Sequence, residues 1–223
     1  ELNDTAVNYA TQTDIPLPLG RTKKEQWEDP RIFNTGRKLW LTCTNFIQGK
    51  TYAHQTMAIL DQTWNIMGIN HPRYGENGHD IWANKGHEKN WTWFMHDGEP
   101  HLIYNIEPHT VLKCDSAASP IQKYETTIDR DIWFYGQRRG GSNPIRIGNE
   151  YFAFFHSSTP WWNGRRRYYM GAYAFEAEPP FRITRSTTIP LMYGSLHNRR
   201  ILEFPLVIFP GGSLYDEDKQ EHF

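Results

Sequence analysis

Three glycine turns, each between two strand-like runs, recur along the chain at nearly regular spacing. Gly36, Gly98 and Gly148 stand in the segments NTGR, HDGE and RIGNE, roughly 50 to 60 residues apart. A short β-forming run precedes each turn, and a longer run and further strand-like runs follow it. A repeat of about 50 residues with four strands in each unit is typical of the blades of a β-propeller.

The sequence shows no helical periodicity that would argue against this β pattern. No stretch of about a dozen residues carries apolar side chains at helical spacing without Gly, Pro or β-forming residues interrupting it. Aromatic residues make up 15% of the chain and gather in the runs KLWLTCTNF, EYFAFFHSS and RYYMGAYAFEA, so we expect an all-β chain. A β-sandwich is the alternative, but its strands would be spaced more evenly and would not fall into groups of four.

The repeat predicts a single domain over residues 1–223, a five-bladed β-propeller whose blades have four antiparallel strands each. Three units are clear in the sequence. A fourth begins in ILEFPLVIFPGGSLYDED and stops in mid-blade, and the polar N-terminal stretch is too short for a blade. We therefore expect incomplete strands at both ends of the propeller.

Charge and composition exclude several classes of protein. The formal net charge is −1 and the pI is near 6.9, so we expect no nucleic-acid partner, because nucleic-acid binders usually carry a basic excess. No apolar run approaches the roughly 20 residues that span a bilayer, and no signal segment is visible, so we expect a cytoplasmic protein without a membrane span. Cys43 and Cys114 lie in strand-like runs and are predicted to be buried free thiols rather than a disulfide.

Familiar catalytic and metal-binding motifs are missing. The sequence has no P-loop, no GxSxG, no HExxH, no GxGxxG after a strand and no Cys/His spacing that suits zinc. We therefore expect no metal site and no required cofactor.

Propellers bind ligands at the axial mouth, so site residues are expected near the start of each blade. The first blade begins WEDPRIF, which contains Glu28, Asp29 and Arg31. These three residues are either a surface ion pair or part of a site in which Asp29 orients a sugar hydroxyl or acts as acid or base.

The second blade begins EKNWTWF. Lys89 can bind a phosphate as a point charge, and Asn90 can hold a hydroxyl. Trp91 and Trp93 share one face of a strand, and we expect that face in the core rather than under a sugar. His109 follows in the turn of IEPHTVL, where it either reaches the mouth or has a structural role.

The third blade begins RRGGSNPIRI. Gly140 and Gly141 allow a close approach of backbone, and Ser142 and Asn143 supply a hydroxyl and an amide, unless the segment is an ordinary turn. His156 ends the strand FAFFHSS and is a further candidate for the site.

A loop with two tryptophans and three arginines follows that strand. Trp161 and Trp162 are expected to form a stacking platform for a glycan, since a packing role is hard to justify in a loop. The arginines at positions 165–167 are either a solvated cluster or a clamp for phosphate or diphosphate, with Arg167 and Tyr169 as its members.

Several segments together resemble a known family. EDPRI, EKNWTWF, LIYNIEPHTVL, GGSNPI and FFHSS…RRYYMGAYAFEAEPPFRI resemble, in order and spacing, the five-bladed propellers of glycoside hydrolase family 130. They are also similar to related propeller glycosyltransferases, including β-mannosyltransferases and an algal-virus β-xylosyltransferase. The resemblance covers roughly residues 27–215, and it implies Asp29 as the catalytic acid or base. It also implies that Lys89, His156 and Tyr169 hold phosphate, although the usual YHG of the family reads FHS here, with Ser157 in place of glycine.

The first functional hypothesis is a glycosyltransferase that moves a sugar, with xylose as a candidate, to an oligosaccharide or glycan acceptor. The donor would be a nucleotide sugar, with a UDP-sugar favoured, and Lys and Arg would neutralise the leaving diphosphate without a metal. One alternative is a glycoside phosphorylase or hydrolase acting on β-linked mannosides or related glycans. The other is a non-catalytic, lectin-like propeller that binds glycans.

Overall fold

The structure is a computed structural model. It describes residues 25–47, 53–61, 63–72, 89–128, 133–194, 207–213, 215–216, 219 and 221–222. The polar N-terminal stretch and the start of the expected fourth unit lie outside the described residues. Within the described ranges the regular structure is β, apart from one 3-10 turn, and no helix is long and apolar enough to cross a membrane.

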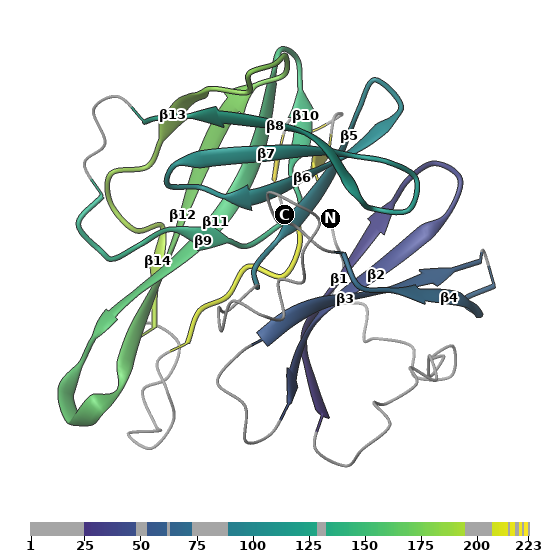
Figure 1. The fold of residues 1–223 in the computed structure, drawn as a ribbon. Coiled ribbons are helices and arrows are strands. Elements are labelled where there is room, and N and C mark those ends of the chain that lie inside the picture. The colour runs from purple at the N-terminus through teal and green to yellow at the C-terminus, as the bar shows by residue number, and fades with distance from the viewer. Residues whose placement is uncertain are drawn as a thin grey trace.

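Three antiparallel sheets, each built around four strands that are consecutive along the main path of the sheet, follow one another along the chain (Figure 1). Sheet 1 consists of β1 (Glu25–Asn34), β2 (Leu39–Ile47), β3 (Ala53–Leu60) and β4 (Ile66–Asn70). Sheet 2 consists of β5 (Thr92–His96), β6 (Glu99–Asn105), β7 (His109–Cys114) and β8 (Pro120–Thr126). Sheet 3 consists of β10 (Ile145–Ile147), β11 (Glu150–Pro160), β12 (Arg166–Glu176) and β13 (Ile183–Ser186). In each sheet the strands lie in chain order, which confirms the predicted four-stranded units.

Short elements complete the described chain. Sheet 3 gains β9 (Arg139–Gly140) beside β11 and β14 (Met192–Tyr193) beside β12, and the 3-10 turn η3 (Trp162–Gly164) joins β11 to β12. A separate hairpin is made of β15 (Tyr215–Asp216) and β16 (Glu221–His222). The described residues do not close into a ring, so the five blades stay a prediction.

The three glycines that mark the repeat occupy equivalent turns. Gly36, Gly98 and Gly148 join the first two strands of sheets 1, 2 and 3, with φ angles of 78°, 74° and 59°. A Cβ at any of them would meet no atom within 4 Å, so the left-handed backbone rather than crowding accounts for glycine there. The turns thus confirm the internal repeat that the sequence predicts.

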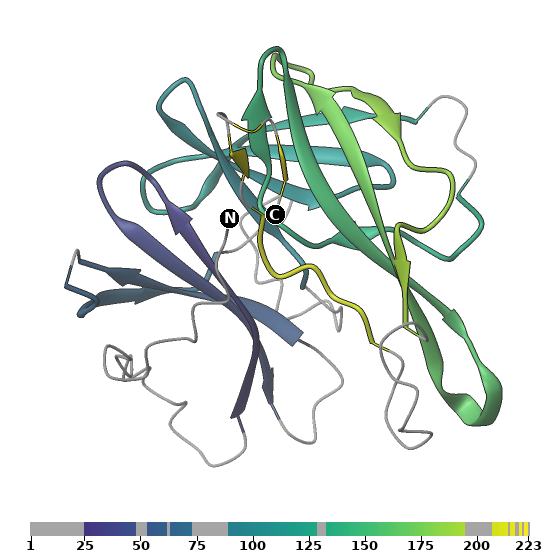
Figure 2. The ribbon, with the colours of Figure 1, turned by 180° about the vertical axis from the view of Figure 1, so that it is seen from behind.

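Sheet 2 is packed between sheets 1 and 3 (Figures 1 and 2). Trp93 points to sheet 1, where its ring lies edge-on to Trp40 at 5.3 Å between centroids, and the next residue, Phe94, points to Phe175 of sheet 3. Because both faces of sheet 2 are covered, neighbouring residues in β5 and β6 are buried together. This stack of separate meanders differs from the two sheets of a sandwich, and it confirms the core role predicted for Trp93.

Both cysteines are buried free thiols, as predicted. Cys43 lies in the core of sheet 1 and Cys114 between sheets 1 and 2. Burial raises the thiol pKa to about 11 for Cys43 and to about 12 for Cys114. Both therefore stay protonated and unreactive at neutral pH.

Candidate functional site

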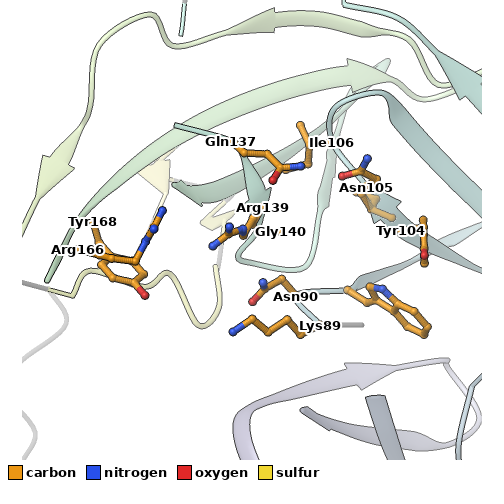
Figure 3. A pocket seen from close by; sticks show the side chains of 12 residues that line it. Lys89, Asn90, Tyr104, Asn105, Ile106, Gln137, Arg139, Gly140, Arg166 and Tyr168 are labelled. Atoms are coloured by element: carbon orange, nitrogen blue, oxygen red, sulfur yellow. The ribbon is translucent and has the colours of Figure 1, made fainter. Parts of the chain in front are cut away.

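A cavity of about 570 Å³ lies where the segment before β5 meets the start of sheet 3 (Figure 3). The segment before β5, the strand β6 and the turn after β6 line one side, and β9, the residue Gln137 before it and β12 line the other. The lining residues are Lys89, Asn90, Trp91, Ile103, Tyr104, Asn105, Ile106, Gln137, Arg139, Gly140, Arg166 and Tyr168. The volume suits a ligand of the size of a disaccharide or larger.

One half of the cavity is cationic. Lys89 and Arg139 extend toward the side where Arg166 and Tyr168 lie, as Figure 3 shows. Two hydrogen bonds hold Arg166 in place, from Nε to Ser158 Oγ and from Nη2 to Ser158 O, both 2.9 Å. No carboxylate is among the described lining residues. Three cations without a carboxylate favour an anionic ligand group in this half.

The other half of the cavity is neutral. The ring of Trp91 lies 5.4 Å from that of Tyr104, between centroids, and both line the wall. Asn105 and Gln137 add amides to this half, and Asn105 Nδ2 donates a hydrogen bond of 2.7 Å to Glu107 O. Aromatic faces beside a few fixed amides are typical of a sugar-binding wall. Trp91, which is 2% exposed, thus belongs to the core and to the cavity together.

The entrance to sheet 2 is held by close backbone contact with sheet 3. Asn90 has a φ of 66°, and a Cβ at Gly140 would lie 2.1 Å from its carbonyl oxygen. Only glycine fits at position 140. The sequence predicts a close approach of backbone at Gly140 and Gly141. At Gly140 the group that approaches is the Asn90 backbone of the same chain rather than a ligand. This backbone contact places the neighbouring Lys89 at the cavity, where the Lys89 Nζ lies 5.3 Å from the centre of the Phe46 ring.

His156 lies behind the cationic half of the cavity. Its side chain is 3% exposed, and its ring lies 6.2 Å from Tyr168 at an angle of 18°. Burial, together with the positive charges of Arg139, Arg31 and Lys89, lowers its pKa to about 3. His156 is thus neutral at working pH. Its Nδ1 has no hydrogen-bond partner among the described residues and can serve a ligand without adding charge.

Asp29 lies at an irregularity of β1. The register with β2 shifts between Glu28 and Arg31, around a proline that offers no ladder hydrogen bond, and Asp29 has a φ of 53°. Arg31 is buried, and its Nε donates to Gly141 O of sheet 3 at 2.7 Å, while Nη1 donates to Asp29 O at 3.3 Å. Burial lowers the pKa of Arg31, and the Asp29 charge opposes this.

Arg31 therefore couples the Asp29 segment to the first residues of sheet 3. Asp29 is half-buried and Glu28 is exposed, and neither is among the described residues that line the cavity. Arg31 is also linked to His156 through Phe209. Its guanidinium carbon lies 4.9 Å from the centre of the Phe209 ring, and the centre of that ring lies 4.5 Å from the centre of the His156 ring.

Ser142 and Asn143 connect parts of the chain. Ser142 Oγ accepts a hydrogen bond from the Phe154 amide at 2.9 Å within sheet 3. Asn143 Oδ1 accepts one from the Trp93 amide, and Asn143 Nδ2 donates one to Ile32 O, both at 3.0 Å. The Asn143 side chain therefore ties the segment between β9 and β10 to both sheet 1 and sheet 2. Both residues are fully engaged within the chain rather than directed at the cavity.

His109 lies in the core between sheets 2 and 3. It is 1% exposed, its Nδ1 lies 2.8 Å from Phe181 O, and its ring lies 5.0 Å from Phe175. Burial lowers its pKa to about 4. The structure thus places His109 away from the cavity, in the structural role that the sequence left open.

Alternation along β12 separates the residues that the sequence had grouped. Arg166 and Tyr168 face the cavity, whereas Arg167 and Tyr169 lie on the opposite face of the strand. Arg167 covers the Trp161 ring, and the Tyr169 ring lies 4.9 Å from Tyr135. Trp161 and Trp162 are exposed near the η3 turn rather than in the cavity. Sequence reasoning missed Arg139, Arg166 and Tyr168 of the cationic half, and also Tyr104, Asn105 and Gln137. For β12 the period of two groups Arg166 with Tyr168, but it does not show that this pair faces the cavity.

Comparison with known proteins identifies the kind of fold. No protein-family model and no curated protein matches the sequence. Among solved structures, the chain is similar to the β-1,2-mannobiose phosphorylase from Listeria innocua, with a TM-score of 0.62 at 16% identity over 86% of this chain and 52% of that one. It is also similar to proposed glycoside hydrolases from Parabacteroides distasonis (TM-score 0.61, 14% identity, 86% and 61% covered) and Bacteroides ovatus (0.58, 12%, 86% and 62%).

At these identities the similarity shows the fold alone. The chain is an all-β protein of the propeller type found in these carbohydrate-active proteins, and it spans between half and two thirds of their length. None of the three is a glycosyltransferase, so they lend no support to the transfer reaction expected from the sequence.

Proposed function

We propose that the chain forms the substrate cavity of a glycoside phosphorylase that acts on β-linked mannosides or related glycans. The observation that carries this proposal is the division of the cavity. Lys89, Arg139 and Arg166 make one half suited to inorganic phosphate, and the aromatic and amide half beside it is suited to a sugar. The five-bladed ring expected from the sequence belongs to this proposal, with the three sheets as three of its blades.

The reaction follows from the two halves. A phosphate oxygen, held by the cations, attacks the anomeric carbon while the bond from that carbon to the glycosidic oxygen breaks. Asp29, which the family resemblance implies as the acid, would give a proton to the leaving oxygen and regain one from the incoming phosphate. It does not belong to the described cavity wall, but Arg31 holds its segment to the start of sheet 3. The products are a sugar 1-phosphate and the shortened glycan. Neutral His156 can add a hydrogen bond to the phosphate without a further positive charge.

Two other reactions fit the same residues less well. With water in place of phosphate the protein would be a hydrolase, and the three cations would have no anion to bind. With a UDP-sugar the cationic half would hold the diphosphate, and Asp29 would orient the acceptor hydroxyl. This transfer reaction is the second candidate, because the cation cluster serves a diphosphate as well as a phosphate.

Turnover of β-linked mannobioses tests the proposal. The full chain would be incubated with each disaccharide, with and without phosphate, and separately with UDP-sugars. We expect sugar 1-phosphate only when phosphate is present, and Asp29→Asn should abolish it while phosphate still binds. Sugar release at the same rate without phosphate would instead identify a hydrolase, and release of UDP a transferase.

Phosphate binding can be measured without turnover. By calorimetry, Lys89→Ala should weaken phosphate binding by about 1.5–3 kcal/mol, the range for a hydrogen bond to a charged group. The matched control is Lys38→Ala, which removes an exposed lysine at the β1–β2 turn and should change nothing. An equal affinity in parent and Lys89→Ala would remove Lys89 from the site.

A further inference from the structure

The hairpin of β11 and β12 extends well beyond the rest of sheet 3 (Figures 1 and 2). Its strands pair over eleven residues each, from Glu150↔Glu176 to Pro160↔Arg166, whereas β9 and β14 accompany them only near the middle. The η3 turn closes the far end, where the Trp161 amide donates to Arg165 O at 2.7 Å. We call residues 161–167 the hairpin tip.

Two neighbouring tryptophans are exposed at the hairpin tip. Trp162 is 77% exposed and Trp161 is 45% exposed. The guanidinium carbon of Arg167 lies 3.3 Å from the centre of the Trp161 ring, so one face of this indole is covered and its orientation is held. Single exposed apolar residues are ordinary on protein surfaces, but two adjacent indoles at the end of a projecting hairpin are typical of a binding surface.

The hairpin tip is also strongly basic. Arg165, Arg166 and Arg167 are consecutive, and the sequence contains no Asp or Glu from residue 151 to residue 175. Within the described part of the chain, Arg166 hydrogen-bonds to Ser158 and Arg167 stacks on Trp161, and neither pairs with a carboxylate. No carboxylate among the described residues therefore neutralises the charge of Arg167.

We propose that Trp161, Trp162 and Arg167 of the hairpin tip form a second ligand site for an acidic polysaccharide, with Arg167 on the opposite face of β12 from Arg166 and the cavity. Sugar rings would stack on Trp161 and Trp162, and carboxylates of the polysaccharide would pair with Arg167. The choice of a glycan rests on the proposed function, and the charge selects an acidic one. A nucleic acid is disfavoured because the chain as a whole has a net charge of −1.

Binding of the full chain to polygalacturonate tests this site, with fully methyl-esterified polygalacturonate as the uncharged comparison. We expect binding to the acidic polymer alone, and weaker binding when NaCl is raised from about 50 to 200 mM, because salt screens exposed charges. The double variant Trp161→Ala/Trp162→Ala should lose about tenfold or more in affinity, as aromatic stacking platforms do. Arg167→Glu should lose a similar factor through charge reversal.

A matched control tests whether any exposed tryptophan has this effect. Trp64 is 37% exposed in the turn between β3 and β4, with a φ of 67° that asparagine tolerates, so Trp64→Asn should bind polygalacturonate like the parent. The variants should also keep the parent melting temperature, since the hairpin tip is outside the core.

Several results would overturn the proposal. They are no binding by the parent at low salt, equal binding to the esterified polymer, an equal loss in Trp64→Asn, tighter binding of single-stranded oligonucleotides, or self-association through the hairpin tip in light scattering. The proposed phosphorolysis is tested apart from this, because the binding assay needs no turnover and Asp29→Asn should bind the polymer normally.

Discussion

Lowering the pH from 7 to 5 is expected to destabilise the fold through its buried histidines. His109 and His156 are 1% and 3% exposed, and burial is the main reason that their pKa values fall to about 4 and about 3. In the unfolded chain a histidine has a pKa of about 6.5. The unfolded state therefore binds more protons, so the stabilisation is complete above about pH 6.5 and is lost as the pH falls toward the folded pKa values.

The size of the effect follows from the same numbers. At pH 5 the unfolded histidines are almost wholly protonated and the folded ones are still mostly neutral. Each then costs about 1.4 kcal/mol for each of the roughly 1.5 pH units below 6.5, which is about 2 kcal/mol, or about 4 kcal/mol for the pair. A typical domain has only about 5–15 kcal/mol of stability. His54, with a pKa lowered to about 4 by burial, adds to the loss.

Urea unfolding at pH 7, 6 and 5, followed by tryptophan fluorescence, measures this loss. Carboxylates titrate mostly below this window, so the slope between pH 6.5 and 5 belongs to the histidines. His109→Gln should reduce that slope by about 1.4 kcal/mol per pH unit, whatever it does to the stability at pH 7. A free energy of unfolding that is the same at pH 7 and pH 5 would refute the reasoning.

Three substitutions test the contacts around the site. Gly140→Ala would put a Cβ 2.1 Å from a backbone oxygen before β5, so the melting temperature should fall by an amount equivalent to about 1–3 kcal/mol, whereas Gly211→Ala, in open space, should not change it. Asn143→Ala leaves a β5 amide without its acceptor and should cost about 1–3 kcal/mol in urea unfolding. Arg139→Ala should weaken phosphate binding about tenfold or more in calorimetry, with the melting curve as its control.

Local features of the fold could be predicted because they depend on neighbouring residues. The left-handed turns at Gly36, Gly98 and Gly148 follow from residues next to one another, and so does the fourfold grouping of strands around them. The burial of Trp93 could be predicted, because two indoles on one face of a strand are typical of a core. The order in which the sheets stack, with Trp93 and Phe94 in different cores, could not be predicted, because it depends on contacts between distant segments.

The candidate site shows the same limit. Strand alternation tells which residues of β12 share a face, but it does not tell which face looks into the cavity, so Arg167 and Tyr169 were chosen over Arg166 and Tyr168. The link from Arg31 to Gly141 joins residues 110 positions apart and leaves no local signal. Lys89 and Asn90 could be found because they stand at the start of a repeat unit, and propellers bind their ligands near the start of each blade.

The hydrogen bond from the Trp93 amide to Asn143 has a consequence for hydrogen exchange. Most protected amides of β5 and β6 are bonded within sheet 2 and exchange only when that sheet opens. The Trp93 amide is protected by a side chain of the segment between β9 and β10, so it exchanges whenever that segment moves away from sheet 2, even while each sheet stays intact. In deuterated buffer this one amide therefore reports the separation of sheet 2 from the start of sheet 3, and a ligand that bridges the cavity should slow its exchange more than that of its neighbours in β5.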